Sequence, residues 1–151
     1  MQEQKTTVGL TIASDFEFVE LAELVATNLA KLIEFDEDAS TWIGMAVREA
    51  VINAIRHGNK QDPNKRVDLR FSLNNDTITV EVIDEGEGFD LRLVPDPLDP
   101  ENLLKPSGRG IFYMRSFMDR VEFSHPPGGG TVVSMSRRKH SQGEVTSHAN
   151  D

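Results

Sequence analysis

Three polar side chains recur at four-residue intervals within a mostly apolar segment of the chain: Glu49, Asn53 and His57. In an α-helix, each four-residue step turns the side chain by only about 40°, so these groups form one polar stripe. Such groups are costly among apolar neighbours unless they find partners. A cleft that holds a polar ligand would supply partners, with Glu49 as a general base and Asn53 as a neutral oxygen ligand for Mg²⁺.

Alternatives stay open for each member of this stripe. The three side chains would also be satisfied by hydrogen bonds to one another or to the core. His57 is followed by Gly58, so it also fits the end of a helix, where a protonated histidine interacts favourably with the last carbonyl groups. The spacing indicates a site without identifying its ligand.

A first glycine-rich segment, Asp84-Glu85-Gly86-Glu87-Gly88, comes directly after an alternating apolar stretch. We expect Asp84 to place a carboxylate at the end of a strand, where a ligand cleft can open. Gly86 and Gly88 permit positive φ angles and a close approach of the backbone to a ligand. A tight turn with exposed acidic side chains is the alternative interpretation of the same residues.

A second glycine-rich segment, Ser107-Gly108-Arg109-Gly110, precedes a predicted helix. Glycines at a helix N-terminus leave backbone N–H groups for an anion, and Arg109 adds positive charge, so this loop is a candidate phosphate site. A flexible hinge is the alternative. The chain has no Gly-x-x-x-x-Gly-Lys-Ser/Thr pattern and no Gly-x-Gly-x-x-Gly in a βαβ unit, so it is neither a P-loop nor a Rossmann protein.

Two helices are predicted before the first glycine-rich segment. Alternation of Val8, Leu10 and Ile12 with polar residues predicts a strand that precedes them. The first helix is expected over residues 15–34. Its apolar side would consist of Leu21, Leu24, Val25, Leu29, Leu32 and Ile33. The second helix, over residues 39–57, carries the polar stripe and would end at Gly58-Asn59.

The remaining elements are short. We predict a hairpin of strands at 67–73 and 78–82, a helix at 110–118, and strands at 120–124 and 131–136. Because strands and helices do not alternate strictly, this order indicates an α+β fold, a two-layer sandwich with helices on one face of a mixed or antiparallel sheet. One domain is expected over residues 1–138, with a polar, disordered tail over 139–151. Residues 89–107 are long for a connection and rich in proline, which suggests a lid or a plain surface loop.

Composition narrows the classes of function. A chain of 151 residues suits one domain, and a net charge of −9 argues against nucleic acid or an anionic membrane as a direct partner. The absence of cysteine excludes disulfide and thiol chemistry. No apolar run approaches the roughly 18 residues that span a bilayer, and no signal peptide is visible, so we expect a cytoplasmic protein.

Taken in order, these motifs resemble those of the GHKL ATPase superfamily. Glu49-Ala50-Val51-Ile52-Asn53-Ala54-Ile55-Arg56-His57-Gly58 resembles its N box, and Asp84-Glu85-Gly86-Glu87-Gly88-Phe89 its first glycine box. Gly108-Arg109-Gly110-Ile111 is similar to the second glycine box, and Gly130-Thr131 to the final Gly-Thr element. The compact size and the Glu-Ala-x-x-Asn-Ala-x-x-His form are most similar to the anti-sigma-factor serine-protein kinases of bacterial partner-switching systems.

The resemblance implies a Bergerat-type ATP-binding fold and a role for each matching position. Glu49 would be the catalytic base that activates a substrate serine, and Asn53 would hold Mg²⁺. Asp84 would bond the adenine amino group, Gly88 would leave room for the ring, and residues 89–107 would form the ATP lid. The implied ATP-binding residues are Asn53, His57, Asp84, Gly86, Gly88, Gly108, Arg109, Gly110 and Thr131.

The implied activity is transfer of the γ-phosphoryl group of ATP to a serine of an anti-sigma-factor antagonist. The implied partners are that antagonist and a sigma factor, held alternately, and a second copy of the chain in a homodimer. The alternatives are a regulatory module that binds ATP or ADP without catalysis and, less favoured, the detached ATP-binding domain of a histidine kinase. The chain departs from many relatives in having fewer glycines in its second glycine box and a proline-rich lid.

Overall fold

The computed structural model describes residues 5–87 and 110–140. This part of the chain contains five strands, three α-helices and two short helical turns. The strands are β1 (Thr6–Ala13), β2 (Arg66–Leu73), β3 (Thr77–Asp84), β4 (Arg120–Ser124) and β5 (Val132–Arg138). The α-helices are α1 (Val19–Leu32), α2 (Glu37–Asn53) and α3 (Gly110–Phe117). The turn η1 (Phe16–Phe18) is 3₁₀-helical, and η2 (Ala54–Gly58) is π-helical.

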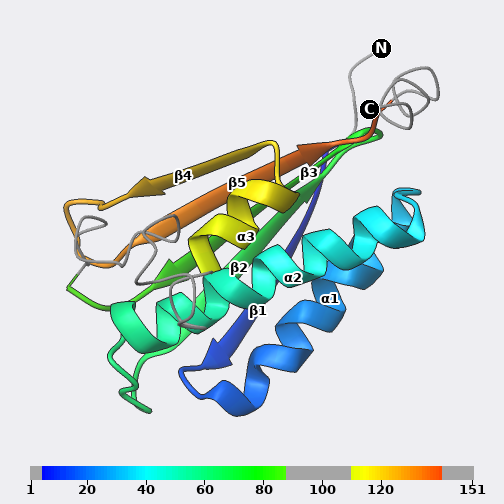
Figure 1. The fold of residues 1–151 in the computed structure, drawn as a ribbon. Helices are drawn as coiled ribbons and strands as arrows, with labels where there is room; N and C mark the ends of the chain where they lie inside the picture. Colours follow the sequence, from blue (N-terminus) through cyan, green and yellow to red (C-terminus); the bar gives the residue numbers. More distant parts are fainter. Residues whose placement is uncertain (1–4, 88–109, 141–151) are drawn as a thin grey trace, which may run out of the picture.

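All five strands belong to one antiparallel sheet in the order β1-β2-β3-β5-β4. The three α-helices cover the same face of this sheet, with α2 between α1 and α3 (Figure 1). The predicted two-layer α+β sandwich is therefore confirmed. All four pairs of neighbouring strands are antiparallel, and two of them, β2–β3 and β4–β5, are hairpins of consecutive strands. No βαβ crossover, which would make a parallel pair, occurs among the described elements.

The core lies between the sheet and α2. In β2 and β3, every second side chain is buried, as the two-residue period of a strand requires. Phe71 of β2 lies opposite Val80 of β3, and both are fully buried. Ile43, Val47 and Val51 of α2 belong to the same core and are also fully buried. This burial anchors α2, so the polar stripe of the helix is carried by a rigid element.

The predicted apolar side of the first helix is right only in part: Leu29 is buried and Val25 and Ile33 pack against the core, but three of its leucines are exposed. Leu21, Leu24 and Leu32 are 44%, 57% and 73% exposed, and the segment 15–34 divides into η1 and α1. The buried side of α1 consists mainly of small residues: Val19, Ala22, Ala26, Leu29 and Ala30. They are small because α1 lies very close to α2, where a Cβ on Gly44 would overlap the Thr27 hydroxyl. Because the two helices pack closely, alanines and not leucines occupy most of the buried side of α1, and the periodicity of apolar residues does not reveal this.

The predicted second helix ends at Gly58-Asn59 as expected, but its last turn is not α-helical. Its α-helical part stops at Asn53, and the last turn is a π-turn in which Asn59 N donates to Ala54 O at 2.7 Å. A π-turn accommodates one extra residue, so the angle assigned to His57 on an α-helical projection does not hold. Asp36 caps the other end of α2, since its side chain accepts from Ala39 N at 2.7 Å.

Several predictions fall on parts of the chain outside the described residues. These are the lid at 89–107, Gly88, Gly108 and Arg109, and most of the tail at 139–151. The domain boundary at 138 stays a prediction. Within residues 5–87 and 110–140, no helix combines the length and the apolar character needed to cross a membrane.

Candidate functional site

A buried carboxylate marks one end of the candidate site. Asp84, the last residue of β3, is only 4% exposed. Its Oδ1 accepts hydrogen bonds from Gly86 N and Thr131 N, both at 3.0 Å. Asp84 N in turn donates to Thr131 O at 3.1 Å. The carboxylate is thereby fixed in orientation by its own turn and by the segment that leads into β5.

Three residues without side chains surround this carboxylate: Gly58, Gly86 and Gly130. A Cβ on Gly58 would overlap the Asp84 carboxyl group, and a Cβ on Gly86 would overlap the carbonyl of Gly58. Gly130 has a φ of +82°, and a Cβ there would overlap the Asp84 carbonyl. Oδ2 of Asp84 lies against Gly58, so the end of η2 and the end of β3 meet with no side chain between them. From sequence, Gly58 was placed at the end of the N-box resemblance and as a helix stop, but was given no role in the site.

Asn59 is a residue of this site that sequence reasoning missed. It is completely buried, and its Nδ2 donates to Ser14 Oγ at 3.1 Å and to Arg66 O at 3.0 Å. Its Oδ1 accepts from Glu85 N at 2.8 Å. One side chain thus joins the end of β1, the start of β2 and the residue after Asp84. The Gly58-Asn59 pair resembles an ordinary helix stop in sequence, so burial is the only signal that distinguishes it.

Replacing Asn59 by alanine is expected to lower the free energy of unfolding by about 3 kcal/mol, because it leaves several buried polar groups without partners. Chemical denaturation followed by circular dichroism measures this change. The matched control is Asn28→Ala on the exposed side of α1, which should change stability by less than about 0.5 kcal/mol. Equal effects of the two substitutions would show that Asn59 does not hold the Asp84 turn.

The other end of the site combines residues from α2 and α3. Asn53 is buried at 6% exposure, and Glu49, one turn earlier, is half-buried. Gly110, the first residue of α3, approaches both side chains. A Cβ on Gly110 would lie 2.9 Å from Glu49 Oε2 and 3.6 Å from Asn53 Nδ2. The glycine at the start of α3 therefore brings a helix N-terminus next to the polar stripe.

The environment shifts the pKa of three of these groups. Burial raises the pKa of Glu49, and Arg48 and Arg56 partly oppose that rise. Burial likewise raises the pKa of Asp84, against the hydrogen bonds from Gly86 and Thr131. The pKa of His57 is lowered by burial and by the charge of Arg56. The neutral imidazole is thus favoured at His57, which weakens the alternative that it acts as a protonated group at a helix end.

The structure brings the described predicted residues into two adjoining groups. Glu49, Asn53 and Gly110 form one group, and Asp84, Gly86 and Thr131 form the other. His57 lies in the η2 turn that connects them, one residue before Gly58. His125 was not predicted, yet its Nδ1 lies 3.3 Å from Thr131 Oγ1. The loop between β4 and β5 gave no sequence signal for that contact.

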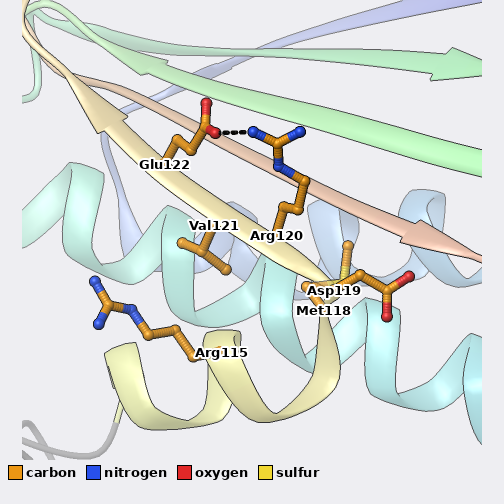
Figure 2. A pocket seen from close by; sticks show the side chains of 6 residues that line it. All are labelled: Arg115, Met118, Asp119, Arg120, Val121 and Glu122. Atoms are coloured by element: carbon orange, nitrogen blue, oxygen red, sulfur yellow. Dashed lines mark hydrogen bonds and ion pairs between the residues drawn. The ribbon is translucent and has the colours of Figure 1, made fainter.

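Two hollows elsewhere in the described structure involve none of the predicted site residues. One, of about 380 Å³, lies between α3 and β4 and is lined by Arg115, Met118, Asp119, Arg120, Val121 and Glu122 (Figure 2). Three of its charged groups have local partners, since Arg120 pairs with Glu122 and Asp119 accepts from Arg138 N at 2.7 Å. The other, of about 310 Å³, lies near the start of α2. Neither combines a buried carboxylate with a helix N-terminus.

Among the described residues, no three histidine, aspartate or glutamate side chains gather as a metal site. The donor set beside Gly110 consists of one carboxylate and one amide. Mg²⁺ fits such a set when phosphate oxygens and water complete its shell, because it is usually bound through few protein ligands.

Comparisons with known proteins show which proteins this chain is similar to. The profile of a family described as the histidine kinase-like ATPase domain matches residues 12–137. The serine-protein kinase RsbW of Bacillus subtilis is 27% identical over 98% of this chain and 94% of its own length. The anti-sigma F factor of Oceanobacillus iheyensis is 33% identical over 89% of this chain and 93% of its own length.

A solved structure has a similar fold. It is the crystal structure of the RsbU and RsbW domains of Rv1364c from Mycobacterium tuberculosis, with a TM-score of 0.63 at 16% identity. The match covers 88% of this chain and 32% of that chain. At this identity the similarity shows the fold alone, and it supports the α+β sandwich with helices on one face.

Proposed function

Because the chain belongs to the histidine kinase-like ATPase domain family, we propose that it is an ATP-dependent serine-protein kinase and anti-sigma factor. Its substrate would be a serine of an anti-sigma-factor antagonist in a bacterial partner-switching system. The relatives that match over nearly the whole chain carry the names serine-protein kinase and anti-sigma factor, which supports this assignment.

The observation that carries the proposal is the cradle around Asp84. A buried carboxylate is oriented by two backbone N–H groups on Oδ1, and the backbone at Gly58, Gly86 and Gly130 packs closely around it with no side chain in between. Such an arrangement suits a flat ring that offers an N–H donor to Oδ2. The exocyclic amine of adenine is a donor of this kind. Thr131, 1% exposed and bonded to the same carboxylate, would support the adenine end.

The phosphate end would lie where α3 begins. Gly110 stands beside Glu49 and Asn53, and Gly108 and Arg109 immediately precede it in sequence. Backbone N–H groups at a helix N-terminus stabilise phosphate charge, and Arg109 would add to them. Asn53 would bind Mg²⁺ through its amide oxygen. When bound, Mg²⁺ would neutralise charge on the phosphates and help to orient them for phosphoryl transfer.

Glu49 would act on the substrate serine. Its carboxylate would accept the hydroxyl proton as the serine oxygen forms a bond to the γ-phosphorus, while the bond from that phosphorus to the β,γ-bridging oxygen breaks and ADP leaves. A raised pKa makes Glu49 a stronger base than an ordinary glutamate. Glu49 is only half-buried, so a substrate serine can still reach it. His57 would border the site in its neutral form.

The partners belong to the same proposal. The antagonist would be the substrate whose serine is phosphorylated. The sigma factor would be the protein that this chain binds once the antagonist has been phosphorylated. The proposal also includes that this chain forms a homodimer and is located in the cytoplasm. The net charge of −9 favours proteins over nucleic acid as direct partners.

A phosphorylation assay tests the proposal. The full chain is incubated with ATP, Mg²⁺ and a candidate antagonist from the same genome, and intact-mass spectrometry then counts phosphates on the antagonist. We expect one added phosphate on a serine, and we expect chelation of the metal to lower the rate at least about 100-fold. Tight ATP binding without transfer to any antagonist would instead identify a regulatory module without catalysis.

A further inference from the structure

One arginine of the sheet contacts both helices that carry the phosphate end of the site. Arg137 of β5 donates from Nη1 to the carbonyl of Phe117, the last residue of α3, at 2.6 Å. Its guanidinium carbon lies 5.2 Å from the ring centroid of Trp42, in α2. A guanidinium beside an aromatic ring is attracted by the ring's electron-rich face, and one at a helix C-terminus is attracted by the helix dipole.

The contact continues as a row of aromatic rings between α2 and α3. Trp42 stacks on Phe117, with ring centroids 6.3 Å apart and an interplanar angle of 4°. Phe117 stacks on Tyr113 at 5.9 Å and 6°. Arg137 therefore holds the C-terminal half of α3 against α2 through a carbonyl and through two stacked rings. None of these residues belongs to the motifs that identified the site.

This contact matters for the site because α3 is short. An eight-residue helix is not stable by itself in water, so its position depends on what it packs against. Its first residue, Gly110, lies so close to Glu49 and Asn53 that a Cβ there would come within 3.6 Å of both side chains. A rotation of α3 about its anchored C-terminal end would move Gly110 relative to both side chains.

The guanidinium is held by these contacts at a cost. Its Nε is buried, and within the described part of the chain it has no hydrogen-bond partner. A buried donor without a partner opposes folding and calls for an explanation. The same guanidinium position gives Nη1 its hydrogen bond to Phe117 O and places the charge beside the Trp42 ring, and these two contacts offset the loss at Nε.

We propose that Arg137 and Trp42 are positioning residues for phosphate binding: they fix α3 on α2 so that Gly110 stays beside Glu49 and Asn53. This inference rests on the proposed nucleotide site. It assigns the two residues to the phosphate end and not to the adenine end, which is built by Asp84, Gly58 and Thr131 from other elements.

The test compares two nucleotides that share adenine and differ in phosphates. Calorimetric titration of Arg137→Gln should show ATP affinity at least about tenfold lower than in the wild-type chain, with AMP affinity unchanged within about twofold. Arg137→Lys, which keeps a positively charged donor for the Phe117 carbonyl, should recover part of the ATP affinity. The matched control is Arg115→Gln, an exposed arginine of α3, which should leave both affinities unchanged.

A second measurement uses the wild-type chain and does not depend on any variant folding. Trp42 is the single tryptophan of the chain, so all tryptophan fluorescence comes from the ring that contacts Phe117 and Arg137. ATP should change its emission, and AMP should not. Equal losses of ATP and AMP affinity in Arg137→Gln, or no loss of either, would overturn the positioning role while leaving the nucleotide site intact. Failure of the wild-type chain to bind ATP would overturn both.

Discussion

Replacing Glu49 by alanine should slow phosphoryl transfer to the antagonist by about 10²–10⁴-fold while changing ATP affinity by less than about threefold. Glu49 lies on the helical stripe next to Asn53 and faces the first residue of α3. As the proposed base it acts on the serine proton, which is a feature of the transition state and not of bound ATP. Single-turnover transfer, measured beside calorimetric ATP titration, separates the two quantities.

The matched control is Glu37→Ala in the exposed first turn of α2, which should transfer phosphate at the wild-type rate. Glu49→Gln keeps the shape of the side chain without its basicity and should be as slow as Glu49→Ala. Transfer retained within about tenfold in both Glu49 variants would remove Glu49 from the catalytic role. Loss of ATP binding in the same variants would instead assign it to the phosphate site.

The rate should also depend on pH through this group. Because burial raises the pKa of Glu49 above its ordinary 4.5, the base becomes protonated, and transfer falls, at a higher pH than an exposed glutamate would give. The decline should occur as pH falls through the raised pKa, and the active form is the one present above it. In Glu49→Gln, the residual rate should lose this decline.

Replacing Asp84 by asparagine should weaken ATP binding by about 100-fold or more with little change in fold. An asparagine oxygen can still accept from Gly86 N and Thr131 N, which both bond Oδ1 of the aspartate. The amide nitrogen would then replace Oδ2 against Gly58 and present a donor where the adenine amine requires an acceptor. Calorimetric titration with ATP measures the loss, and the thermal midpoint checks the fold.

The control for this substitution is Asp38→Asn, which neutralises an exposed acid at the start of α2 and should leave ATP affinity unchanged. GTP should bind the wild-type chain much more weakly than ATP, because guanine offers a carbonyl oxygen at the position of the adenine amine. If Asp84→Asn bound ATP with wild-type affinity, the adenine ring would bind elsewhere, and Asp84 would not be an adenine-binding residue.

Much of the fold follows from local pattern. The alternation in β2 and β3, the Asp36 cap of α2 and the glycine that begins α3 each act within a few residues, so they are visible in one stretch of sequence. The two-layer α+β arrangement was therefore predictable. The apolar side of α1 was not, because the choice between leucines and alanines depended on the close approach of Gly44 to Thr27 across two helices.

The groups available for chemistry follow from local spacing: the stripe of Glu49 and Asn53 on a core helix, and Asp84 at the end of a strand. Spacing along one helix or strand sets these relations, so no other part of the chain is needed to infer them. Three contacts come instead from the packed fold: Gly58 meets Asp84, Asn59 accepts from the residue after Asp84, and Arg137 joins β5 to α2 and α3. These contacts join residues distant in sequence through packing and hydrogen bonds, which leave no periodic pattern along the chain.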